Sequence, residues 1–133
     1  MSQGHRLLSL DGGGVRGLAS LYLLRKILSF VGSPKPCDYF DMICGTSTGG
    51  LIAIMLGRLE MTVEQCIEAY IDMMDVIFDP KDRARLPFRV RNGKVKPRYK
   101  TEQLEQAIKQ VIRNSGAMTD DRFRGDKQST CKT

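Results

Sequence analysis

The chain has 133 residues, of which 41% are hydrophobic and 27% are charged, and these values are typical of one globular domain with a core of its own. The net charge of +6 favours anionic partners, such as phospholipid surfaces or nucleic acid, without selecting one. No apolar run approaches the roughly 18 residues of a membrane-spanning helix, so we expect no membrane-spanning helix in these residues. The four cysteines lack metal-ligand spacing, so we expect neither a zinc site nor a disulfide framework.

The first elements predicted are a strand, a glycine-rich loop and a helix. Residues Leu7 to Leu10 are apolar and too few for a helix, which favours a buried strand. The loop runs from Asp11 to Gly17, and apolar residues then recur at helical spacing from Leu18 to Val31. Residues 34–38, which hold two prolines, are predicted to form a loop.

A second strand is predicted from Tyr39 to Cys44, and an apolar helix from Gly50 to Leu56. Because this helix is apolar all round, we expect it to be central and buried. Two cysteines, Cys44 and Cys66, lie in apolar periodic segments and are expected to be buried thiols.

Two further helices follow. Thr62 and Gln65 have the spacing of a capping box, and the helix that they open carries its acidic residues away from its apolar face. Another helix begins at Thr101, with Gly116 as a left-handed cap. Residues 117–133 are predicted to form a polar tail.

The segment between these helices, residues 81–100, is strongly basic and is predicted to be a surface loop or lid. Alternation around Asn92-Gly93 predicts a small hairpin. Its charges either meet phosphate head groups or belong to an ordinary solvated loop, and the sequence leaves both interpretations open.

The most informative turn reads Gly45-Thr46-Ser47-Thr48-Gly49. Gly-x-Ser-x-Gly between a strand and a helix is the pattern of a nucleophile elbow, in which a sharp turn presents the serine. The helix that follows directs its free N–H groups and its positive dipole end towards negative charge that develops beside Ser47. Ser47 is therefore the candidate nucleophile.

The first glycine-rich loop admits two interpretations. Gly12, Gly14 and Gly17 satisfy the dinucleotide-binding pattern, and Asp38 lies near the distance of a ribose-binding acid. However, the residues before Asp38 form a poor strand, whereas that fold needs its acid at the end of the second strand.

The alternative use of this loop is an oxyanion hole for Ser47. The backbone N–H groups of Gly12, Gly13 and Gly14 allow close approach, and the N–H of Thr48 adds a donor from a second direction. Arg16, near the end of the loop, is a candidate contact for a phosphate or carboxylate.

The base that activates Ser47 is inferred by elimination. The α/β-hydrolase order places a histidine after the serine, but the single histidine, His5, precedes the first strand. The base would then be a carboxylate that acts directly on the serine.

The motifs at 11–17 (Asp-Gly-Gly-Gly-Val-Arg-Gly) and 45–49 resemble the patatin-like phospholipase family of lipid acyl hydrolases, which use a Ser-Asp dyad. Residues 97–100 before the Thr101 helix are similar to a weaker family segment. The resemblance spans residues 7–112 and implies a three-layer α/β domain with a mostly parallel sheet. It also implies that Ser47 is the nucleophile and that Gly12 to Gly14 form the oxyanion hole.

One family feature is missing. The dyad aspartate of the family lies in a later Asp-Gly-Gly or Asp-Gly-Ala turn, and the sole Asp-Gly here is Asp11-Gly12. We therefore expect residues 1–133 to be the truncated N-terminal part of one catalytic domain, with little activity alone.

The overall prediction is a phospholipase A or lysophospholipase-type serine hydrolase without cofactor or metal. Its partners would be a phospholipid or other lipid ester and a peripheral membrane surface, but no nucleic acid, in a cytoplasmic setting. The alternatives are an inactive lipid-binding or regulatory module and, further off, a dinucleotide-binding domain. The sequence does not specify the oligomeric state.

Overall fold

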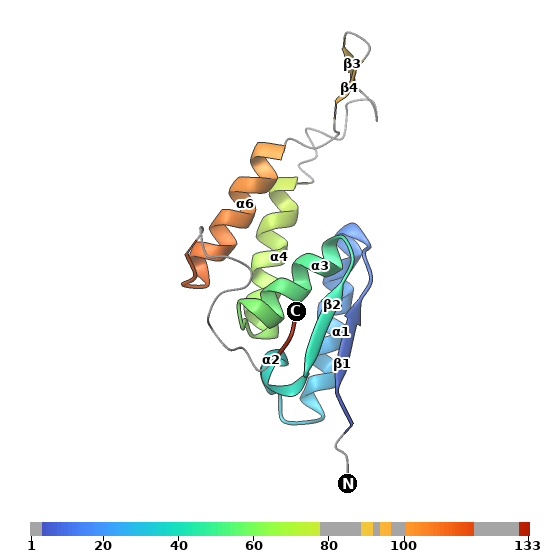
Figure 1. Ribbon diagram of the computed structural model, residues 1–133, viewed down its shortest axis with the longest axis vertical. Helices are drawn as coiled ribbons and strands as arrows, with labels where there is room; N and C mark the ends of the chain where they lie inside the picture. Colours follow the sequence, from blue (N-terminus) through green and yellow to red (C-terminus); the bar gives the residue numbers. More distant parts are fainter. Residues whose placement is uncertain (1–3, 78–88, 92–93, 97–100, 119–130) are drawn as a thin grey trace.

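The computed structural model describes residues 4–77, 89–91, 94–96, 101–118 and 131–133 (Figure 1). The elements along the chain are β1 (Leu7–Leu10), the 3-10 turn η1 (Gly14–Arg16), α1 (Gly17–Ser29), α2 (Pro36–Tyr39), β2 (Met42–Gly45), α3 (Thr48–Ala53), the π-helical turn η2 (Ile54–Arg58), α4 (Val63–Ile77), β3 (Arg89–Arg91), β4 (Lys94–Lys96) and α6 (Thr101–Asn114).

The central sheet is parallel. β1 pairs with β2 in the register that sets Leu7 opposite Met42 and Leu10 opposite Gly45. Lys132 continues the sheet beyond β2 as a parallel bridge to Met42, in which the Ile43 N–H donates to the Lys132 carbonyl at 2.8 Å. Because β1 and β2 run in the same direction, the glycine-rich loop and the serine turn leave the sheet at the same end.

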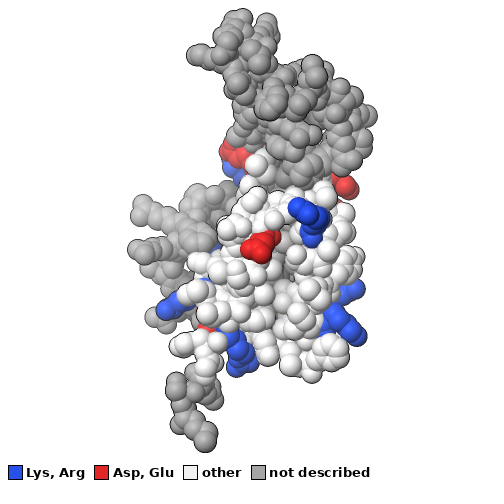
Figure 2. All heavy atoms as spheres, turned by 90° about the vertical axis from the view of Figure 1, so that its right-hand side faces the viewer, with Lys and Arg blue, Asp and Glu red and all other residues white. Residues whose placement is uncertain are grey.

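The described helices cover one face of this sheet. Side chains alternate along a strand, so Leu10 and Ile43 point to the helices and are buried, whereas Leu7 and Met42 point away and are 65% and 39% exposed. Figure 2 views the molecule from its β1 side, where a largely uncharged surface carries few Lys, Arg, Asp or Glu side chains. The parallel α/β class is confirmed. Of the three layers that the family resemblance implies, the described residues supply the sheet and one helical layer.

The core lies between the sheet and α1, α3 and α4. Its fully buried side chains include Leu21, Ile52, Leu56 and Tyr70. The burial of the helix after the serine turn is thus confirmed, although its last turn widens into η2. The prediction for 34–38 was wrong in part, because Pro36 begins the short α2, and β2 starts only at Met42. Proline suits a first helical turn, where its missing N–H costs nothing.

The helical predictions further along are largely confirmed. The Thr62 N–H donates to Gln65 Oε1 at 2.9 Å, and the Gln65 N–H donates to Thr62 Oγ1 at 3.2 Å, which is a complete capping box. α6 begins at Thr101 and packs along α4, and Gly116 has a left-handed φ of 80°.

The basic segment and the tail are described only in part. β3 and β4 pair antiparallel with Val90 opposite Val95, as the hairpin prediction requires, and the rest of 81–100 lies outside the described residues. Residues 119–130 also lie outside them. The polar-tail prediction was wrong for the last three residues, because Cys131 is buried and Lys132 pairs with β2.

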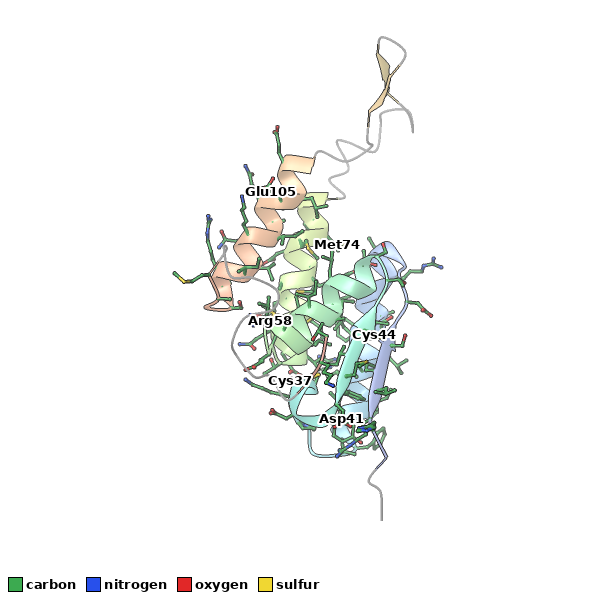
Figure 3. The ribbon with its side chains drawn as sticks, in the orientation of Figure 1. Cys37, Asp41, Cys44, Arg58, Met74 and Glu105 are labelled. Carbon is green, nitrogen blue, oxygen red and sulfur yellow. The ribbon has the colours of Figure 1, made fainter. Side chains whose placement is uncertain are left out.

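One cysteine prediction was wrong and the other is confirmed. Cys44 is exposed on β2 (Figure 3), because alternation turns it outward when Ile43 points inward. Cys66 is buried, and burial raises its thiol pKa to about 12.

We predict that iodoacetamide at pH 8 modifies Cys44 in the folded chain and leaves Cys66 unmodified until denaturant is added. The raised pKa keeps the Cys66 thiol protonated, and only the thiolate is an effective nucleophile. Peptide mass spectrometry measures both rates. Equal modification of the two cysteines in the folded chain would contradict the placement of β2 and α4.

Candidate active site

The serine turn has the backbone geometry of an elbow. β2 ends at Gly45 and α3 begins at Thr48, and between them Ser47 has φ 51° and ψ −126°. A positive φ is uncommon for a residue with a side chain. The turn is held by the Gly49 N–H, which donates to the Thr46 carbonyl at 2.9 Å. Ser47 itself is exposed at the end of the sheet.

Two glycines allow the strand and the helix to meet at this turn. A Cβ on Gly45 would overlap the Gly49 carbonyl, and a Cβ on Gly49 would overlap the Leu10 carbonyl at the end of β1. At both positions the overlapping atoms belong to the backbone, which cannot relieve the overlap by changing a side-chain rotamer. The glycines of the motif therefore set how closely α3 approaches both strands.

The structure brings the glycine-rich loop and the serine together. A Cβ built on Gly12 would lie 2.8 Å from the Ser47 Cβ and 3.5 Å from its Oγ. The Thr46 N–H also donates to the Leu10 carbonyl at 3.1 Å, which links the two turns. Gly12, Ser47 and Thr48 therefore belong to one site at the carboxyl end of the sheet.

The loop amides are engaged rather than open, which differs from the sequence prediction. The Gly12 N–H donates to Thr46 Oγ1 at 3.1 Å. The N–H groups of Gly13 and Gly14 both donate to Thr48 Oγ1, at 3.2 and 3.1 Å. The two threonines that flank the serine thus hold the loop against the elbow. As the first residue of α3, Thr48 has no intrahelical acceptor for its own N–H.

A tyrosine from α4 completes this arrangement, and sequence reasoning treated it only as core. The Tyr70 hydroxyl donates to the Gly14 carbonyl at 2.6 Å. Burial raises the pKa of Tyr70, and a hydrogen bond with the Thr48 hydroxyl opposes that rise. The usable signal was general: a tyrosine at a core position needs a partner for its hydroxyl.

The remaining candidates lie around or away from this site. Arg16 is exposed near the end of the loop, and its backbone N–H donates to the Gly13 carbonyl at 3.2 Å. Its contact with a phosphate stays a prediction. His5 lies at the opposite end of the sheet, where its Nδ1 is 3.9 Å from Asp41 Oδ2 (Figure 3). Among the described residues, no carboxylate or imidazole is hydrogen-bonded to the Ser47 hydroxyl.

Asp38 does not lie where a ribose-binding acid of a dinucleotide site would be needed. Asp38 lies in α2, which precedes β2, so it is at the end of the sheet away from the glycine-rich loop (Figure 1). Within the described ranges, no group of three His, Cys, Asp or Glu side chains could hold a metal ion. The same part of the chain contains no helix long and apolar enough to cross a membrane.

A parallel α/β unit with a serine turn between a strand and a helix has the strand–turn–helix arrangement of a nucleophile elbow in an α/β domain. The model of the patatin-like phospholipase family matches residues 8–128. The chain therefore belongs to this family, and its matched part is the N-terminal portion of the family domain.

Curated relatives agree with this assignment. The chain is 43% identical over 117 residues to phospholipase A I of Arabidopsis thaliana, covering 85% of this chain and 8% of that protein. It is 42% identical over 76 residues to human calcium-independent phospholipase A2-gamma, covering 57% of the chain and 10% of the relative. Patatin-like protein 2 of Arabidopsis thaliana is 35% identical to the chain over 117 residues. The match covers 77% of this chain and 28% of that protein. The chain thus spans less than a third of each of these relatives. No solved structure matches it.

Proposed function

We propose that this chain supplies the nucleophile and the oxyanion hole of a lipid acyl hydrolase of the phospholipase A or lysophospholipase type. The observation that carries the proposal is the close approach of Gly12 to Ser47, where a Cβ on Gly12 would overlap the serine side chain, so that an exposed hydroxyl on an elbow lies beside a row of backbone amides. Family membership directs that chemistry to lipid esters.

In the proposed reaction, Ser47 Oγ attacks the ester carbonyl and a tetrahedral oxyanion forms. The Thr48 N–H at the start of α3 donates to this oxyanion, as do the amides of the Gly12 to Gly14 loop. A charged acceptor forms stronger hydrogen bonds than a neutral hydroxyl, and one N–H can be shared between two acceptors. The loop amides can therefore stabilise the oxyanion while they keep their threonine contacts.

The proton of Ser47 requires a base, and the described residues offer none in hydrogen-bonding contact with it. We propose a carboxylate from a part of the protein outside the described residues, in the role of the dyad aspartate that the family resemblance implies. As the tetrahedral intermediate collapses, the ester C–O bond breaks, the protonated carboxyl gives its proton to the leaving oxygen, and the lyso-lipid departs as an alcohol. The same carboxylate then accepts a proton from water, which attacks the acyl-enzyme, and returning that proton to Ser47 Oγ releases the fatty acid.

The direct test is fatty acid release from phosphatidylcholine vesicles by the full-length protein, measured with substrates labelled at either acyl position. Release that depends on Ser47 supports the proposal. A folded full-length protein that releases no fatty acid from any phospholipid or lysophospholipid would contradict it.

A second candidate function, binding of anionic lipid surfaces without hydrolysis, is supported by the β3–β4 ribbon. The register pairs Arg89 with Lys96 and Arg91 with Lys94, so these four basic positions belong to one face of the ribbon. Each charge near an anionic surface contributes on the order of 1 kcal/mol, which suits a peripheral membrane contact.

We predict that the double variant Lys94→Gln, Lys96→Gln weakens binding to phosphatidylserine-containing vesicles by roughly tenfold or more at low salt, with a smaller effect at high salt. Vesicle co-sedimentation measures the change. Arg25→Gln, Lys26→Gln on α1 is the matched control, because it removes the same charge elsewhere. Equal losses in the two variants would show that net charge, and not the ribbon, is responsible.

A further inference from the structure

We infer that Tyr70 is a positioning residue for the glycine-rich loop, acting from the core through the carbonyl of Gly14, the residue whose N–H is held by the Thr48 hydroxyl. This inference rests on the proposed function for its catalytic consequence, while its structural part stands on the contacts of the loop itself.

Tyr70 reaches the glycine-rich loop from the core. Its side chain is completely buried on α4, and 56 residues separate it from Gly14, to whose carbonyl it donates at 2.6 Å. Its hydroxyl end occupies space that a side chain at position 17 would fill, because a Cβ on Gly17 would overlap the Tyr70 hydroxyl. The third glycine of the loop motif thus serves to admit this tyrosine.

Gly14 links Tyr70 to the serine turn. Thr48 Oγ1 accepts the N–H groups of both Gly13 and Gly14, and the Tyr70 hydroxyl donates to the Gly14 carbonyl. Gly14 is therefore held at its carbonyl by Tyr70 and at its N–H by Thr48. Because Thr48 follows Ser47 directly, the same contacts fix the loop relative to the nucleophile.

This loop needs support from outside itself. Gly13 and Gly14 carry no side chains that could pack against the core. Gly14 has a φ of 56°, a conformation that glycine enters and leaves at little energetic cost. Donors of an oxyanion hole are effective because they are fixed before the reaction. The rigid anchor here is a tyrosine in the fully packed core.

The test compares Tyr70→Phe, which keeps the ring and removes the hydroxyl, with Tyr22→Phe, which removes a hydroxyl from the partly exposed tyrosine on α1. Hydrogen–deuterium exchange of the amides at 12–14 in the full-length protein is the first readout. We expect roughly tenfold faster exchange at Gly13 and Gly14 in Tyr70→Phe, no change in Tyr22→Phe, and an unchanged exchange rate in the interior of α1 in both.

A second pair of variants separates the hydroxyl of Thr48 from its shape. Thr48→Val should speed the exchange of the same amides, and Thr48→Ser, which keeps the hydroxyl, should restore slow exchange. In the hydrolysis assay, Tyr70→Phe should lower kcat by roughly tenfold at nearly constant KM, since substrate binding away from the loop is unaffected.

The outcomes are separable. Faster loop exchange with lower kcat supports the whole inference. Faster exchange in a protein whose parent chain has no hydrolase activity supports the structural anchor and rejects the proposed function. Unchanged exchange at Gly13 and Gly14 in Tyr70→Phe overturns the inference whatever Thr48→Val shows, as does slower exchange or a general increase that includes α1.

Discussion

Ser47→Ala is expected to abolish covalent labelling by a fluorophosphonate probe and to lower lipid hydrolysis at least about a thousandfold. The reason is positional as well as chemical. Ser47 is the residue of the turn that combines an exposed side chain with a positive φ next to the glycine-rich loop. Neighbouring hydroxyls cannot replace it, because those of Thr46 and Thr48 already accept loop amides.

The labelling experiment uses gel fluorescence and intact mass, with Ser29→Ala as the control. Ser29 ends α1, and its hydroxyl donates to the Lys26 carbonyl at 2.7 Å, so its loss removes a serine that has no part in the site. The control should label like the parent chain. Undiminished labelling of Ser47→Ala would place the reactive group elsewhere and would reject the elbow as the site of reaction.

Gly49→Ala is expected to be strongly destabilising, costing about 3 kcal/mol and lowering Tm by roughly 10 °C. The added methyl would overlap the Leu10 carbonyl and lie about 2.9 Å from that of Asp11. Since both are backbone atoms, relief requires α3 to move away from β1. That movement would also separate the serine turn from the glycine-rich loop.

Gly4→Ala is the matched control, because a methyl there would meet nothing within 4 Å. Thermal unfolding followed by circular dichroism measures both variants. A Tm of Gly49→Ala within about 2 °C of the control would mean that α3 does not pack against β1 as described.

The local elements could be predicted because their signals are local. The strand at Leu7–Leu10, the capping box of Thr62 and Gln65, and the left-handed Gly116 each follow from a few adjacent residues. The proximity of the two glycine turns also followed, because parallel strands end at the same edge of a sheet. These are the features that short sequence patterns and the direction of the strands decide.

Other features depended on tertiary neighbours that no local pattern specifies. Cys44 lies in an apolar run, yet the alternation of side chains along β2 turns it outward. Whether Cys44 or its neighbours are buried depends on which face of the sheet the helices cover. The engagement of the loop amides by Thr46 and Thr48 was missed because a threonine beside a nucleophile is equally consistent with a solvated side chain. The reach of Tyr70 to Gly14 spans 56 residues and has no counterpart in local spacing.

The most direct measurement of the central claim is a crystal structure of the full-length protein after reaction with a fluorophosphonate. The account predicts phosphorus bonded to Ser47 Oγ, with the phosphoryl oxygen accepting hydrogen bonds from the Thr48 N–H and from an amide of the Gly12 to Gly14 loop. An adduct on another residue, or one on Ser47 whose phosphoryl oxygen points into solvent away from both turns, would contradict it.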